Sequence, residues 1–342
     1  MAFRLIATDE AGYGPKLGPL VIGATDWQTE FSGPAITTET LTKQFAPLAQ
    51  VYRVGDAKVL VNDSKAVYKP RSNQSSSAGK LLDPLGNLHA TVSVANRCCS
   101  DSCNVSIKRF DQWLKVVAGS DWKSIKATPW LADVQSSKFL VDSLIDEAVG
   151  HWKTAGAALQ CFRGRVIPAS QFNAACDGGM NKADLLSEST LGLVRDLLDG
   201  KPHNSVATAS KHPTWVFCDR HGGRRYYAGV LQHVFPGSEV QVVSESKQQS
   251  VYRMQYSGQT ALVHFTVKGD SFIPVALSSI YAKYIRERMM ESVNQFFLAH
   301  HTGKQPLQPT AGYPVDADRF LSEIESTMRK QSIAMDDLVR RR

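Results

Sequence analysis

The stretch IATDEAGYGP, residues 6–15, places two neighbouring carboxylates at the end of an apolar run. Successive side chains of a strand point to opposite faces of its sheet, so a regular strand would separate Asp9 from Glu10. The glycines and the proline that follow predict that the chain leaves the strand at Ala11, and Glu10 is then free to turn towards the side of Asp9. We therefore expect both acids to serve one site.

Two further carboxylates stand at the ends of predicted strands. TWVFCD (214–219) ends on Asp219, and ALVHFTVKGD (261–270) ends on Asp270. In α/β sheets, sites form where strand ends meet loops, so strands packed side by side would bring all four acids together. Clustered carboxylates repel one another unless cations neutralise them, and oxygen ligands suit Mg²⁺ or Mn²⁺, here as two ions. For each single acid, a loop cap or an ion pair with Arg or Lys stays open as the alternative.

The periodicity of the rest of the chain predicts an α/β fold. Residues 19–27 form an apolar run that would pair with the first strand as a hairpin. Further strands are expected at 158–167, 214–219 and within 239–270, and helices at 136–152, 181–198, 224–235, 273–301 and 317–330. Strands come first and then alternate with helices, which favours a mixed sheet with helices on both faces.

We expect one domain over residues 1–330. Residues 71–135 are rich in Ser and Gly near their start and show weak periodicity, so they predict a peripheral insertion that contributes little to the core. Residues 331–342 are expected to form a basic C-terminal tail.

Composition narrows the class of protein. Hydrophobic residues make up 43% of the 342, enough for a sizeable core, and the net charge of +7 fits a polyanionic partner such as nucleic acid. The cysteines of RCCSDSCN (97–104) lack a second Cys or His pair at zinc-ligand spacing. No apolar run reaches the roughly 18 residues that span a membrane, and no secretory leader is recognisable. We expect a cytoplasmic protein without a membrane partner.

Five blocks resemble, in order, the signature of type 2 ribonuclease H (ribonuclease HII). DEAGYGPKLGPLVIGA (9–24) is similar to the opening Asp-Glu-Ala-Gly-Arg-Gly-Pro of that family. VKGDSFIPVALSSIYAKYIRER (267–288) is similar to its Lys-x-Asp followed by Ser-Ile-x-Ala-Lys-x-x-Arg. The other three blocks are VNDSK (61–65), VFCD (216–219) and AGYP (311–314).

The resemblance implies a ribonuclease H-like mixed sheet with C-terminal helices. It also implies a metal-dependent endoribonuclease that hydrolyses the RNA strand of RNA–DNA hybrids and leaves 3′-hydroxyl and 5′-phosphate ends. By matching position, it implies that Asp9, Glu10, Asp219 and Asp270 are the catalytic acids and hold Mg²⁺ or Mn²⁺. Contacts to the hybrid are implied for Gly12, Tyr13, Gly14, Ser64, Lys65, Lys268, Ser279, Lys283, Arg286 and Tyr313.

The implied contacts differ in chemistry. The glycines would let backbone amides approach nucleic acid, and Tyr313 would stack on the sugar whose 2′-hydroxyl marks RNA. Ser279, Lys283 and Arg286 fall at helical spacing, so one face could meet phosphates, although a plain solvated face stays open. Tyr13 stands where the family has an arginine, and a tyrosine cannot neutralise a phosphate.

Other functions remain as alternatives to the endoribonuclease. A catalytically silent nucleic-acid-binding relative is favoured by Tyr13 and disfavoured by the four intact acids. A nuclease of the same fold that cuts a DNA junction is disfavoured by the Gly-Tyr-Pro block, which fits a protein that recognises ribose. A nucleotide-binding phosphate loop is disfavoured because GYGPKLG lacks the GK[ST] ending.

Overall fold

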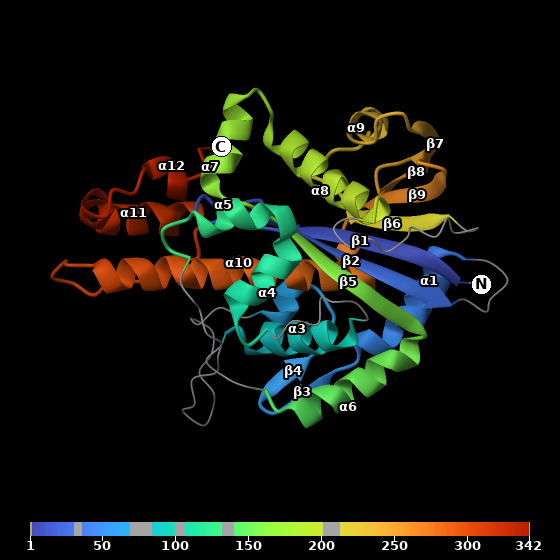
Figure 1. The fold of residues 1–342 in the computed structure, drawn as a ribbon, viewed down its shortest axis with the longest axis horizontal. Coiled ribbons are helices and arrows are strands. Elements are labelled where there is room, and N and C mark those ends of the chain that lie inside the picture. Colours follow the sequence, from blue (N-terminus) through green and yellow to red (C-terminus); the bar gives the residue numbers. More distant parts are fainter. Residues whose placement is uncertain are drawn as a thin grey trace.

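The computed structural model describes residues 2–30, 36–68, 84–99, 107–131, 140–200 and 213–341. Within them, a mixed sheet of seven strands has the order β5-β2-β1-β6-β9-β8-β7, and β3 and β4 form a separate hairpin. Helices flank the large sheet (Figure 1), which confirms the expected α/β class with helices at the C-terminal end. The strands are β1 (Ala2–Ala11), β2 (Leu20–Glu30), β3 (Tyr52–Val54), β4 (Ala57–Val59), β5 (Ala157–Ile167), β6 (Thr214–Asp219), β7 (Glu239–Glu245), β8 (Gln249–Tyr256) and β9 (Gln259–Thr266).

The helices follow the predicted order, with several shifted ends. The strand at 19–27 pairs antiparallel with β1 as expected, and the helix expected at 224–235 is shorter. The helix expected at 136–152 is described only from Asp142, and residues 132–139 lie outside the described ranges. The helices are α1 (Thr38–Phe45), α2 (Ser64–Val67), α3 (Gly86–Cys98), α4 (Phe110–Ala118), α5 (Trp122–Lys126), α6 (Asp142–Trp152), α7 (Ala169–Asp177), α8 (Lys182–Leu198), α9 (Ala228–Val234), α10 (Ile273–His300), α11 (Pro314–Lys330) and α12 (Met335–Leu338).

Three parallel strands at the centre of the sheet bring the predicted acids to one edge. β1 pairs with β6 from Leu5↔Trp215 to Thr8↔Cys218, and β6 pairs in parallel with β9. The carboxyl ends of these strands therefore point the same way. Asp219 is the last residue of β6, and the segment that leads to Asp270 follows β9 directly.

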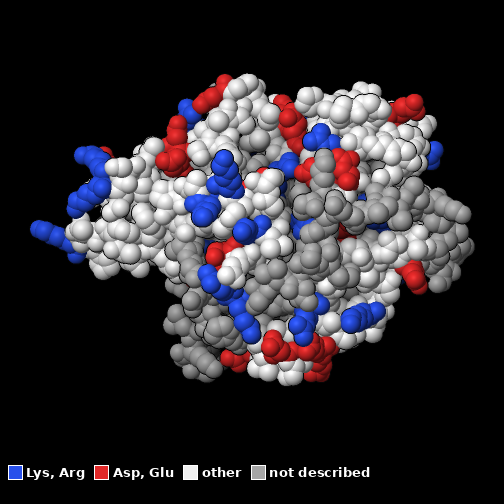
Figure 2. Space-filling view, in the orientation of Figure 1, with Lys and Arg blue, Asp and Glu red and all other residues white. Residues whose placement is uncertain are grey.

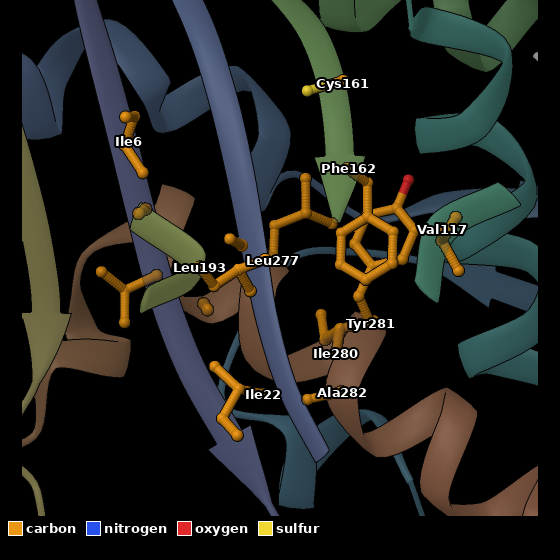
Figure 3. Close-up of a cluster of buried hydrophobic side chains, with 14 of the residues drawn as sticks. Ile6, Ile22, Val117, Cys161, Phe162, Leu193, Leu277, Ile280, Tyr281 and Ala282 are labelled. Carbon is orange, nitrogen blue, oxygen red and sulfur yellow. The ribbon is translucent and has the colours of Figure 1, made fainter. Parts of the chain in front are cut away.

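The 28-residue helix α10 packs closely on the centre of the sheet. Gly23 of β2 makes this possible, because a Cβ at that position would lie 2.4 Å from the carbonyl oxygen of Ser278. The Ser278 hydroxyl donates to the carbonyl of Ala7 at 2.9 Å, which ties the helix to β1. Figure 3 shows Phe162 of β5 face to face with Tyr281 of α10, with ring centroids 3.6 Å apart.

The expectation of a peripheral insertion over residues 71–135 is wrong for the described part of that segment. Leu88 of α3 and both Phe110 and Trp113 of α4 are fully or almost fully buried in the main hydrophobic core. Figure 1 shows α3 and α4 beside α10, on the side of the sheet opposite α8. Residues 69–83, 100–106 and 132–139 lie outside the described ranges.

In the described residues, the basic C-terminal segment expected from residue 331 packs against the rest of the domain. The amide of Arg340 donates to the carbonyl of Lys16 at 2.9 Å, and Leu17 forms a β-bridge with Val339. The Arg340 side chain is buried and donates to the carbonyl of Pro15. The last turns of the chain therefore brace the loop that follows Glu10. Within the described ranges, every helix is too short or too polar to cross a membrane.

Candidate active site

Asp9, Glu10 and Asp219 converge at the point where β1 and β6 separate. Each offers a carboxylate oxygen, and these oxygens all lie within 4.8 Å of one another. The pairing of β1 with β6 stops at Thr8↔Cys218, so beyond it the two strands are no longer paired with each other, while Asp9 stays paired with β2 and Asp219 with β9. The three acids therefore form one cluster at the edge that the strand ends define.

The cluster forms although Asp9 and Glu10 belong to opposite faces of β1. Asp9 pairs with Gly23, which faces α10, whereas Glu10 has the parity of Arg4, whose guanidinium donates to the carbonyl of Leu197 in α8. Strand β1 ends at Ala11 as expected, but Glu10 is still paired with β2. The prediction that Glu10 must leave the strand is therefore wrong. Both side chains instead reach the open edge from their own faces.

Burial raises the pKa values of all three carboxyls, and repulsion within the cluster adds to the rise for Asp9 and Glu10. For Asp9, burial is the largest cause, followed by the charges of Glu10 and Asp219. Burial and the charge of Asp219 raise the pKa of Glu10 to about 7. Burial raises the pKa of Asp219 although the amide of Gly269 donates to its Oδ1 at 2.6 Å. Carboxyls perturbed in this way require either protons or bound cations.

The donor set fits a hard divalent cation. All three groups supply oxygen ligands, and among the described residues no nitrogen or sulfur ligand belongs to the same cluster. Without a cation, the carboxylates repel one another. Asp9, Glu10 and Asp219 would hold the ion. A divalent cation bound there would supply Lewis-acid activation of a water molecule.

Asp270 lies beside this cluster without joining it. Its charge raises the pKa of Asp219, but its own neighbours are Asp63, which raises its pKa, and Lys65, which lowers it, after the larger effect of burial. Asp63 also caps α2 by accepting from the amide of Lys65 at 2.9 Å. Asp63 belongs to the block VNDSK, but no spacing in the sequence indicates that it lies beside Asp270.

The metal-free protein is expected to become less stable as pH rises from about 5 to about 8. Glu10 has a pKa of about 7 in the folded chain against an ordinary 4.5, so in this window the folded state keeps a proton that the unfolded state has released. Such a difference corresponds to on the order of 3 kcal/mol. Thermal melts in EDTA across this pH range would measure it. The Glu10→Gln variant should flatten the profile, and a wild-type melting temperature that rises with pH would contradict the assignment.

The resemblance implies that Arg286 contacts the hybrid, but in the structure its guanidinium is not available to a phosphate. Its guanidinium is 1% exposed and donates to Glu287 at 2.7 Å and to the carbonyl of Ala311 at 2.9 Å. Its side chain also packs under Gly12, where a Cβ would lie 2.8 Å from the Arg286 Cδ. Gly12 has a φ of +88°, so this glycine is needed both for its backbone conformation and for the close contact. Arg286 therefore packs against Gly12 and supports the conformation of the loop that follows β1.

The other predicted contact residues are spread around the cluster. Ser279 lowers the pKa of Asp9 against the larger effect of burial, and its hydroxyl donates to the Ser64 hydroxyl at 3.2 Å, which joins α10 to α2 beside the acids. Lys283 forms an ion pair with Glu287 at 2.9 Å and lies over the ring of Tyr68. The exposed residues among the predicted contacts are Gly14, Lys65, Lys268 and Tyr313.

The Gly-Tyr-Pro segment is tied to the loop after β1. The amides of Lys16 and Leu17 donate to the carbonyl of Gly312 at 2.8 and 3.1 Å. Tyr313 is 51% exposed, so its ring is open to a ligand. The net charge does not mark the site by itself, because Figure 2 shows basic and acidic side chains both scattered over the viewed face.

No model of a known protein family and no curated protein matches this chain. Solved structures that it resembles include Bst-RNase HIII in complex with Mn²⁺, with a TM-score of 0.40 and 13% identity over 99% of this chain and 66% of that one. The ribonuclease H2 from Pyrococcus horikoshii OT3 has a TM-score of 0.42 and 13% identity over 99% of this chain and 93% of that one. The RNase HII of the PCNA complex from Archaeoglobus fulgidus has a TM-score of 0.40 and 13% identity over 99% and 95%.

Proposed function

We propose that this protein is a metal-dependent endoribonuclease that hydrolyses the RNA strand of RNA–DNA hybrids and leaves 3′-hydroxyl and 5′-phosphate ends. The observation that supports it best is the carboxylate cluster of Asp9, Glu10 and Asp219 at the ends of adjacent parallel strands. These residues belong to the sequence blocks that resemble ribonuclease HII. The same cluster in a silent binding protein would retain the cost of repulsion without a use for it.

Different residues of this chain would have different roles in the proposed reaction. The three clustered acids would bind the cations, and Asp270 with Asp63 would extend the acidic edge beside them. Ser279 lies next to Asp9 and is hydrogen-bonded to Ser64, and these hydroxyls could donate to a backbone phosphate. The exposed ring of Tyr313 would contact the ribose at the cleavage site.

Cleavage of defined duplexes tests the proposal. End-labelled hybrids that carry one or four ribonucleotides are incubated with the purified chain in EDTA, Mg²⁺ or Mn²⁺. We expect cuts on the RNA side only with a divalent ion, and products with 5′-phosphate ends. Absence of cleavage of either duplex with any divalent ion, while the hybrid is still bound, would replace the endoribonuclease by the silent binder.

A further inference from the structure

Among the described residues, no carboxylate pairs with Lys182, a cation that the ring of Tyr13 separates from the acidic cluster. It is the first residue of α8, and its ammonium lies 4.6 Å from the centroid of the Tyr13 ring. Tyr13 follows Glu10 by three residues, and the charge of Glu10 contributes to the raised pKa of the Tyr13 hydroxyl after burial. Lys182 thus lies on the α8 side of the sheet, the side to which Glu10 belongs.

The position of Lys182 is electrostatically unfavourable in the free protein. The N-terminus of a helix carries positive partial charge, which favours acids rather than lysines in the first turn. Burial and the charge of Arg340 lower the pKa of Lys182 further. Within the described ranges, no ion pair or hydrogen bond offsets these effects, and Asn181 already accepts from the first amides of the helix. An unneutralised ammonium in this setting favours an anion beside it.

A second cation on the same edge is already neutralised. Arg224, in the loop after β6, forms an ion pair with Asp184 of the first turn of α8. Its charge also reaches the Tyr13 hydroxyl, whose pKa it lowers against the larger effect of burial. Asp184 balances Arg224, so among the described residues the uncompensated positive charge near Tyr13 belongs to Lys182 and to Arg340. Arg340 is buried and donates to the carbonyl of Pro15, whereas Lys182 is partly exposed and can meet a ligand.

The side chain of Tyr13 is held in place between Lys182 and the loop after β6. A Cβ at Gly222 would lie 2.4 Å from the Tyr13 hydroxyl oxygen, and Gly222 has a φ of +53°. This packing fixes the hydroxyl end of the ring, and the ammonium of Lys182 lies over the ring itself. The ammonium of Lys182 therefore covers one face of the Tyr13 ring.

We propose that Lys182, oriented by the ring of Tyr13, binds a phosphodiester group of the nucleic-acid strand next to the acidic cluster. The inference rests on the proposed function for its substrate, and it adds a residue that no sequence block contains. A strand that places one phosphate at Asp9, Glu10 and Asp219 through cations would place another against the unneutralised ammonium. Phosphate contacts of this kind fix the register of a duplex without reading its sequence.

Salt-dependent binding tests the role of Lys182 separately from catalysis. A fluorescent RNA–DNA hybrid is titrated with the full chain in EDTA, where hydrolysis is prevented, at several KCl concentrations. Lys182→Met should reduce the slope of log affinity against log salt by about 0.9 and the affinity by roughly tenfold at 0.1 M salt, because one phosphate is no longer neutralised. Lys182→Arg should restore both values.

Lys153→Met is the matched control. This exposed lysine precedes β5, whose first residue pairs with Thr29 of β2, at the end of the sheet opposite the acids. Its slope should equal that of the wild type. A wild-type slope for Lys182→Met, or a hybrid that the wild type does not bind, would overturn the inference. Binding that depends on Lys182 together with absent cleavage would support it and contradict only the proposed endoribonuclease.

Discussion

Replacing Asp219 by asparagine is expected to lower the turnover of hybrid cleavage by at least about a thousandfold, roughly 4 kcal/mol of transition-state stabilisation. The change keeps the shape of the side chain and its acceptor for the amide of Gly269, but it removes one charge from the three-carboxylate cluster. Because Asp219 contributes to the raised pKa values of Asp9 and Glu10, the metal-free variant should be as stable as the wild type or more stable.

Single-turnover cleavage and metal-free melts, measured side by side, separate these effects. Asp146→Asn is the matched control, since Asp146 lies on α6 and pairs with Arg97 on an exposed surface. That variant should cleave like the wild type. If Asp219→Asn retained cleavage within tenfold, or lost it together with its cooperative melt, the cluster would not be the catalytic centre that its geometry supports.

The acidic edge of the sheet could be predicted from the sequence, because each acid is marked by the residues directly before it. An apolar run that ends on a carboxylate predicts a strand end, and parallel strands place such ends together. Asp9 and Asp219 follow this rule directly. Asp270 does not join the cluster, because Lys268 in a left-handed conformation and a short 3₁₀ turn separate it from the end of β9.

Residues whose role depends on a partner far along the chain could not be assigned from spacing. Helical spacing predicts that Lys283 and Arg286 share one face of the helix. In the structure Glu287 forms ion pairs with both, and Arg286 also donates a hydrogen bond to the carbonyl of Ala311. Lys182 carries no motif at all. Its importance follows from contact with Tyr13, which lies 169 positions earlier in the sequence.

The segment 71–135 was misjudged for a related physical reason. Periodicity reveals a helix that has one buried and one solvated face. In α3, every residue from Leu88 to Asn96 is buried, so no polar face alternates with an apolar one. A short helix buried on all sides shows little periodicity in its sequence, and its position in the core becomes visible only when β4, α6 and α10 are placed around it.

Trp113 of α4 is the residue whose truncation should cost most stability in this segment. Its ring is fully buried, lies nearly parallel to Phe162 and Tyr281 at centroid distances of 6.0 and 6.2 Å, and meets Tyr284 edge to face. Its Nε1 also donates to Asn96 of α3 at 3.0 Å. Trp113→Ala should therefore lower the free energy of unfolding by about 3–5 kcal/mol, through lost burial and the cavity that remains.

Chemical denaturation of Trp113→Ala and of Lys115→Ala measures this contribution within one helix. Lys115 is exposed on α4, so its truncation should change the free energy of unfolding by less than about 0.5 kcal/mol. Helix α4 packs on β5 and, through Tyr281, on α10. Truncation of Trp113 would therefore also remove packing from α10, the helix that carries Ser279 beside Asp9. Equal stability of the two variants would mean that α4 is peripheral after all, and that the sheet and α10 hold the acidic edge without it.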